Sequence, residues 1–218
     1  MKRALFVTLI LCLCAVQAST AFAQSGRKYT FFVSGDINAA ISPTKFTDYY
    51  SKGFGLTAGV EVPVSPAWSF TGSIGYKTFK PDEGMIAEWW DDEGEYPGST
   101  NIRVSEGSLD VVTLAILGKG ALKSEASKVW PYIKGGFGLT IGGADEILVQ
   151  FDQFGGPREE WVGGTESGTN FSVQIAVGVE FKLGSGNTAL FADVGLAMVS
   201  VDELDNPTVV PLNVGIKF

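Results

Sequence analysis

The sequence predicts an all-β protein, an eight-stranded antiparallel up-and-down β-barrel that crosses a membrane with its strands and follows an N-terminal signal peptide. Three observations support this fold. Apolar residues alternate with polar or small residues over stretches of about the 9–11 residues that a membrane strand needs. After residue 24, no apolar run approaches the roughly 20 residues of a membrane helix. Short and long connections alternate between the segments, so we expect residues 24–218 to form a single barrel domain.

The first 23 residues have the pattern of a secretory signal peptide. Two basic residues precede an apolar run at residues 5–16, and Ala21-Phe22-Ala23 places small residues at the −3 and −1 positions of a cleavage site. The alternative is a membrane anchor, but the apolar run is too short for one. We therefore expect residues 1–23 to be cleaved during export.

Composition excludes several classes of function. The sequence contains no histidine, which excludes Ser-His and Cys-His catalysis and His-based zinc or haem sites. Its two cysteines, Cys12 and Cys14, lie in the expected signal peptide, so the mature chain has no thiol chemistry. A net charge of −8 argues against nucleic-acid binding. We expect no enzymatic activity, no cofactor and no metal centre.

Period-two alternation defines the strands. The clearest example runs from Phe171 to Leu183, where every second residue is apolar and the residues between them are polar or small. The same criterion predicts strands at residues 28–40, 53–64, 68–79, 108–122, 129–141, 169–183, 188–201 and 208–218. The segment 108–122 is apolar on both sides, so its faces cannot be assigned from the sequence.

The connections between these strands differ in length. Those at residues 65–67, 123–128 and 184–187 are short, whereas those at 41–52, 80–107, 142–168 and 202–207 are mostly longer. In barrels that span an outer membrane, short turns face the periplasm and long loops face outside. We therefore expect the long connections to be extracellular loops.

Charged residues at inward positions of the strands predict a polar barrel interior. The acidic members are Asp36, Glu61, Glu180 and Asp193, and the basic members are Lys77, Lys134, Lys182 and Lys217. A buried charge is costly unless it is paired, so these residues are expected to form a structural charge network. The alternative is that they line a selective pore or a proton path, although eight strands leave little room for water.

The C-terminus carries a recognisable pattern. Residues 210–218 alternate and end in an aromatic residue, and the apolar positions are Val210, Leu212, Val214, Ile216 and Phe218. This pattern resembles the signal that barrel-assembly machinery reads, and Pro131-Tyr132 followed by Gly135-Gly136-Phe137-Gly138 resembles a strand of the OmpA/OmpX-like small outer-membrane β-barrel proteins. The resemblance implies a barrel in the outer membrane of a Gram-negative bacterium, in contact with lipid and lipopolysaccharide. It does not imply one activity.

The long connections are acidic and contain the candidate recognition residues Trp89, Trp90, Asp91, Asp92 and Glu93. Carboxylates in this segment could capture a divalent cation, or they could form a solvated acidic rim. The two tryptophans could anchor an extracellular ligand or pack the loop onto the barrel. The sequence thus favours a non-enzymatic barrel with a structural or surface-interaction role through acidic extracellular loops. The alternative function is a narrow channel or small-solute transporter.

Overall fold

The computed structural model describes residues 29–42, 47, 49–92, 100–123, 127–153, 156–184, 188–200 and 206–218. The expected signal peptide and Glu93 lie outside these residues. Within the described part, no helix is long and apolar enough to cross a membrane.

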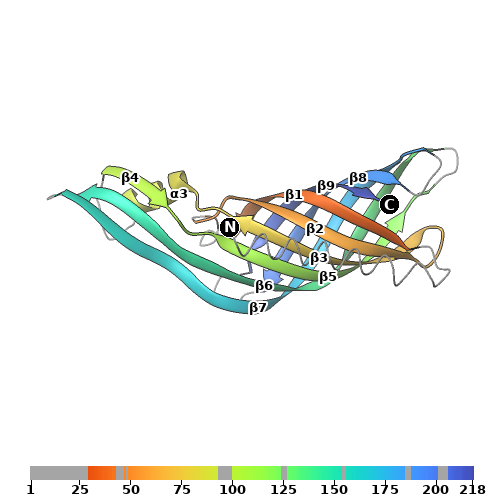
Figure 1. Cartoon of the computed structure of the whole chain (residues 1–218), viewed down its shortest axis with the longest axis horizontal. Helices are drawn as coiled ribbons and strands as arrows, with labels where there is room; N and C mark the ends of the chain where they lie inside the picture. Colours follow the sequence, from red (N-terminus) through yellow and green to blue (C-terminus); the bar gives the residue numbers. More distant parts are fainter. Residues whose placement is uncertain are drawn as a thin grey trace.

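Eight antiparallel strands close into a barrel (Figure 1). They are β1 (Thr30–Ser42), β2 (Lys52–Pro63), β3 (Trp68–Phe79), β5 (Leu109–Ala121), β6 (Val129–Gln153), β7 (Gly156–Lys182), β8 (Ala189–Ser200) and β9 (Thr208–Lys217). Each strand pairs with the next, and β1 pairs with β9, for example through Val33 and Ile216. The closed ring therefore gives the backbone N–H and C=O groups of the strands hydrogen-bond partners, which the hydrocarbon of a membrane cannot provide. The predicted eight-stranded barrel is confirmed.

The two faces of the barrel wall differ as the alternation predicts. On β7, the side chains of Phe171, Val173 and Ile175 are about half exposed, whereas Ser172 and Glu180 point into the bore and are buried. On β5 the inward residues are Ala115, Leu117, Lys119 and Ala121, and the outward residues include Leu114 and Ile116. The structure thus assigns the faces of the segment whose sequence is apolar on both sides.

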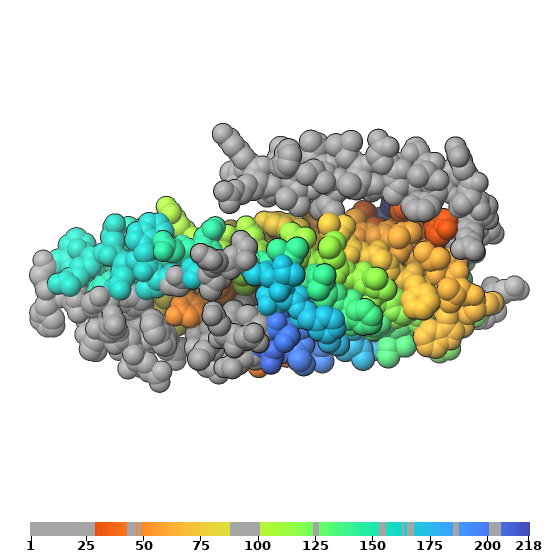
Figure 2. All heavy atoms as spheres, turned by 90° about the horizontal axis from the view of Figure 1, so that it is seen from below, coloured from red at the N-terminus to blue at the C-terminus, as the bar shows by residue number. Residues whose placement is uncertain are grey.

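The two ends of the barrel are unlike. The connections 64–67, 122–128 and 183–188 lie at the end where β9 and the chain finish, which we call the short-turn end. At the opposite end β6 and β7 run on beyond the barrel as a hairpin, with paired positions from Ala144↔Thr165 to Gln153↔Gly156. Figure 2 shows this hairpin, in cyan, projecting past the barrel wall.

The expectation that residues 142–168 and 80–107 are loops is wrong. The first segment is mostly strand, and the second contains helix α3 (Glu83–Asp92) and strand β4 (Thr100–Ser105), which pairs with β6. The reason is burial: Ile147, Val149 and Phe151 alternate on β6 and pack in a cluster with Ile86 of α3 and Val104 of β4. We call α3, β4 and the hairpin part of β6 and β7 the platform.

Local signals explain the platform's elements. Asp82 caps α3, because its Oδ1 accepts hydrogen bonds from the backbone N–H of Gly84 (3.1 Å) and Met85 (3.3 Å). β4 and β5 lie along the same edge of β6 and are separated by a break at Glu106 (φ 65°) and Gly107 (φ 80°). A Cβ at Gly107 would also approach Ile147 to 2.8 Å, so the break depends on glycine.

Candidate functional site

Four buried charged side chains form a closed ion quartet inside the bore. They are Glu61, Lys119, Glu180 and Lys217, each within two residues of the short-turn end of its strand. Each ammonium group contacts both carboxylates: Lys119 lies 3.0 Å from Glu61, Lys217 lies 2.5 Å from Glu180, and the other two ion pairs are closer still. All four residues are 3–6% exposed. Two negative and two positive charges alternate, so the quartet is neutral as a unit.

Aromatic side chains surround the quartet. Phe32 packs edge-to-face on Phe191, with ring centroids 5.8 Å apart, and both belong to a cluster with Tyr132 and Ala121. The Lys119 ammonium group lies 4.4 Å from the centroid of the Tyr132 ring. An eight-stranded barrel has an interior just wide enough for side chains to fill, and here they fill it at the short-turn end.

Asp193 is held by three donors. Its oxygens accept hydrogen bonds from the Tyr132 hydroxyl (2.6 Å), the Lys134 ammonium group (2.7 Å) and the Asn213 amide (2.7 Å). The side chain of Asp193 is completely buried. A buried carboxylate with three donors has its charge compensated, so this group fixes β6, β8 and β9 relative to one another.

Asp36 forms a similar group farther along the bore. It accepts a hydrogen bond from the Asn38 amide (2.5 Å) and one from the Thr57 hydroxyl (3.3 Å), and its Oδ1 lies 3.9 Å from the Lys77 ammonium group. Lys77 also donates to the side-chain amide oxygen Oδ1 of Asn38 at 2.9 Å. These contacts join β1, β2 and β3.

The structure brings seven of the eight predicted interior charges into these three groups: Asp36, Glu61, Lys77, Lys134, Glu180, Asp193 and Lys217. Lys182 departs from the expectation. It is the last residue of β7, beyond the quartet, and its ammonium group lies 5.8 Å from the Trp130 ring centroid. Sequence reasoning missed Lys119, which lies in the interior as the fourth lysine in place of Lys182. Alternation gave no signal for Lys119, because inward Leu117 and outward Ile116 are both apolar; the signal that could have found it is its charge, which is unfavourable on the lipid face of a barrel.

A cavity of about 60 Å³, lined by both polar and apolar side chains, occupies the middle of the bore. Its lining includes Lys77, Lys134, Gln174 and Asn213, together with several serine and threonine side chains. This volume has room for several water molecules. Beyond the cavity, toward the platform, buried Phe79 and Val209 belong to the same hydrophobic cluster as the platform's core. Side chains therefore fill the bore on both sides of the cavity.

One glycine allows the interior groups to pack. A Cβ at Gly178 would lie 2.5 Å from the Asp193 Cβ and 2.6 Å from Cζ of the Tyr132 ring. By contrast, a Cβ at Gly72 would meet no atom closer than 4.0 Å. Gly178 is therefore a position of close approach, and the contact between Tyr132 and Asp193 depends on it.

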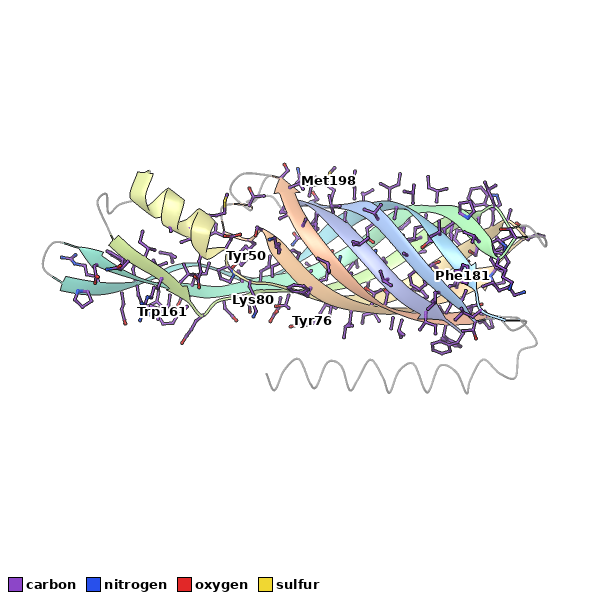
Figure 3. The ribbon with its side chains drawn as sticks, turned by 90° about the horizontal axis from the view of Figure 1, so that it is seen from above. Tyr50, Tyr76, Lys80, Trp161, Phe181 and Met198 are labelled. Carbon is purple, nitrogen blue, oxygen red and sulfur yellow. The ribbon has the colours of Figure 1, made fainter. Side chains whose placement is uncertain are left out.

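The platform is fixed to the barrel mouth through Asp82 and Tyr50. The Ser51 hydroxyl donates a short hydrogen bond to Asp82, and the Asp82 backbone N–H donates to the Tyr49 carbonyl at 2.9 Å. The Ser51 hydrogen bond holds the pKa of Asp82 below its ordinary value. Burial raises the pKa of Tyr50 to about 12, and Figure 3 shows this residue between the barrel and α3.

The remaining predicted residues are placed as follows. The segment with Trp89, Trp90, Asp91 and Asp92 is the second half of α3, and these side chains lie outside the described ones. On β9, the apolar positions Val210, Leu212, Val214, Ile216 and Phe218 alternate with the more buried ones, and Leu212, Val214 and Phe218 are 47–59% exposed. Among the residues that the structure describes, no group of three or more acidic, cysteine or histidine side chains could hold a metal ion.

Three solved structures are similar to this chain, and the first of them shows the same fold. Neisserial surface protein A matches with a TM-score of 0.50 and 14% identity, over 87% of this chain and 95% of that one. Ail of Yersinia pestis matches with a TM-score of 0.44 and 14% identity, over 87% of this chain and 98% of that one. The N-terminal barrel of OprF of Pseudomonas aeruginosa matches with a TM-score of 0.41 and 9% identity, over 87% and 97%.

The search of curated proteins found no significant match. The family model of the outer membrane protein beta-barrel domain matches residues 6–218, which is nearly the whole chain. With the closed ring of eight strands, this match shows that the chain belongs to the outer membrane protein beta-barrel family, whose members are transmembrane barrels of the Gram-negative cell envelope.

Proposed function

We propose that the protein is a closed, non-enzymatic barrel that holds a folded recognition surface, the platform, outside the cell. In barrels of this family short turns face the periplasm, which supports an orientation with the platform end outside. The observation that carries the proposal is the platform's own hydrophobic core. Ile86, Ile147 and Val149 are each no more than 1% exposed although they lie beyond the membrane-spanning part of the barrel.

A core of this kind gives the platform a fixed shape. A preorganised surface loses less conformational entropy when it binds than a mobile loop does. The sheet face turned away from α3 is the candidate contact surface, because Trp161 on it is 52% exposed and points away from the helix (Figure 3). Tryptophan is a common anchor of protein interfaces. The exposed carboxylate of Glu159 lies two residues from Trp161 on the same face of β7, opposite Gln150 of β6.

The charge of the platform region indicates the class of partner. Residues 81–107 contain eight acidic residues and one arginine, and residues 142–168 contain six acidic residues and one arginine. Electrostatic complementarity favours a cationic partner and speeds its association. We therefore propose a surface-interaction role with partners that carry net positive charge.

The test compares cells that display equal amounts of the wild-type barrel and of the variant E159Q/W161A, whose two substituted residues lie on this outer sheet face. Adhesion is measured on amine-coated and uncharged surfaces, with Met85→Ala of the opposite platform face as the control. We expect the double variant to lose most of the adhesion that the wild type confers and the control to keep it. Equal adhesion by wild type and double variant, with folding verified by heat-dependent gel mobility, would contradict the proposal.

The second candidate is a narrow channel, and the mid-bore cavity is the observation that favours it. Conduction would require both the ion quartet and the mouth residues around Phe79 to move apart. Single-channel recording of the refolded protein in a planar bilayer tests this function. Ion-selective current steps whose size changes in Lys134→Met or Glu180→Gln would support the channel. The absence of current from a folded barrel would mean that the residues of the bore have a structural role only.

Export and assembly complete the proposal. We expect signal peptidase to cut after Ala23, so that N-terminal sequencing of the membrane protein begins at Gln24. We also expect the assembly machinery to read the C-terminal strand, and deletion of Phe218 to lower the amount of folded barrel. In the structure the backbone N–H of Phe218 donates to the Phe31 carbonyl at 2.9 Å, so a Phe218→Ala variant, which keeps this bond, separates recognition from barrel closure.

A further inference from the structure

Two exposed lysines face each other on the outside of the barrel wall at the platform end. β2 pairs with β3 up to Gly53↔Phe79, and one further step of this register places Lys52 opposite Lys80. The two segments remain together past this step, because the Asp82 N–H donates to the Tyr49 carbonyl at 2.9 Å. Residues directly opposite on neighbouring strands have Cβ atoms about 5 Å apart.

Both lysines extend from the lipid-facing side of the wall. Lys52 is the next outward residue beyond Phe54, which is 57% exposed, and Lys80 is the next outward residue beyond Thr78, which lies opposite Phe54. Two residues of a strand span about 7 Å, so the lysines lie directly beyond the apolar surface. Figure 3 shows Tyr76 and Lys80 close together on one side of the barrel, where the wall meets the platform.

The nearby carboxylates accept hydrogen bonds from other groups, and beside the Ser51 hydrogen bond the charge of Lys52 makes a smaller contribution to the lowered pKa of Asp82. Asp82 accepts hydrogen bonds from Ser51 and from the first turn of α3, and Asp110 accepts one from the Tyr76 hydroxyl at 2.9 Å. Within the described residues, neither Lys52 nor Lys80 has a carboxylate oxygen within 4.0 Å. Two like charges directly opposite on a sheet destabilise it unless an anion lies between them.

We propose that Lys52 and Lys80 bind the phosphate group of a lipid in the outer leaflet of the outer membrane. The position supports a lipid, because the edge of the apolar surface is where headgroup phosphates lie and where lysine side chains extend to reach them. The charge supports a phosphate, because a dianion neutralises both ammonium groups at once. This site is independent of the platform's outer face, but its assignment to the outer leaflet rests on the proposed orientation, in which the platform end lies outside the cell.

The test measures how much lipid the purified protein retains in detergent. The probes are bisphosphorylated lipid A, chemically dephosphorylated lipid A and inorganic phosphate, and bound lipid is counted by native mass spectrometry. The variant K52Q/K80Q removes the pair. K123Q/K128Q is the matched control, because it removes two exposed lysines at the short-turn end. K52R/K80R keeps the charge.

We expect K52Q/K80Q to retain bisphosphorylated lipid A about tenfold more weakly than the wild type, while K123Q/K128Q and K52R/K80R behave like the wild type. Dephosphorylated lipid A is expected to bind all variants weakly and equally. The proposal is overturned if K52Q/K80Q binds as the wild type does, if both glutamine variants weaken binding equally, or if the phosphate groups make no difference. Displacement of the lipid by millimolar inorganic phosphate would overturn the assignment to a lipid.

Discussion

Removal of the Lys119 ammonium group tests whether the ion quartet stabilises the barrel. In Lys119→Met, Glu61 and Glu180 lose two of the four ion pairs and share Lys217 alone. Lys119 is 3% exposed, so water cannot replace it, and one negative charge is left uncompensated in the bore. Breaking a buried ion pair by removing one partner typically costs about 3–5 kcal/mol.

The free energy of unfolding is measured by urea titration in lipid bilayers, with the folded fraction read from gel mobility without heating. Lys182→Met is the matched control, because this lysine lies near the Trp130 ring at the rim of the barrel, outside the quartet. Loss of an exposed cation–π contact costs about 0.5–1 kcal/mol, so the two substitutions differ severalfold in their expected effect.

A double variant makes the prediction stricter. Lys119→Met with Glu180→Gln leaves one carboxylate and one ammonium group, Glu61 and Lys217, in direct contact. We expect this variant to recover part of the stability that Lys119→Met loses, because the buried charge is neutral again. A Lys119→Met barrel within about 0.5 kcal/mol of the wild type, or a double variant less stable than both single ones, would refute the reasoning.

Three further predictions concern other parts of the molecule. Gly178→Ala should cost about 1–3 kcal/mol in urea titration by overpacking the Tyr132 contact, whereas Gly72→Ala should be tolerated; equal stability of both variants would contradict this. Ile86→Ala should make the platform, but not the barrel, sensitive to protease, because truncation of a buried isoleucine costs about 2–5 kcal/mol; an unchanged cleavage pattern would contradict it. The pKa of Asp82 is lowered in the folded state, so its carboxylate stabilises α3 above the ordinary pKa of 3.8 and loses this effect as pH falls below it. The protection of residues 83–92 from hydrogen exchange, relative to an unstructured chain at the same pH, should therefore fall below about pH 3.8 in the wild type and be low at all pH values in Asp82→Ala.

The barrel could be predicted because one physical constraint repeats along it. A wall with lipid outside and a packed bore inside requires alternation with period two, and segments such as 171–183 show it without interruption. The same logic placed Glu180 and Lys217 in the interior. It failed to find Lys119 because Leu117 and Ala115, which share its inward face, are apolar. Small barrels accept apolar residues inside, so hydrophobicity alone does not distinguish their two faces.

The platform was missed for a different reason. Ile147, Val149 and Phe151 alternate, and Gly155-Gly156-Pro157 follows them, which is a hairpin pattern. The many acidic residues around this pattern favoured a solvated loop, and α3 spans only ten residues, so its amphipathic pattern is brief. Neither element is stable alone, since a two-stranded hairpin and a short helix are both marginal in water. Their stability comes from burying Ile86 against the hairpin, which is a long-range contact that local patterns do not contain.

The distribution of buried residues along the barrel axis bears on where function lies. At the short-turn end, alternating charges and aromatic rings fill the bore, and at the mouth Phe79 and Val209 join the platform's core. Movement of a solute through the barrel would therefore disrupt two separate clusters that also hold the strands together. Binding at the platform's outer face or at the outward lysine pair disrupts neither. On energetic grounds, this distribution supports the proposed surface-interaction role over the channel, and the bilayer recordings and adhesion assays described above distinguish the two possibilities directly.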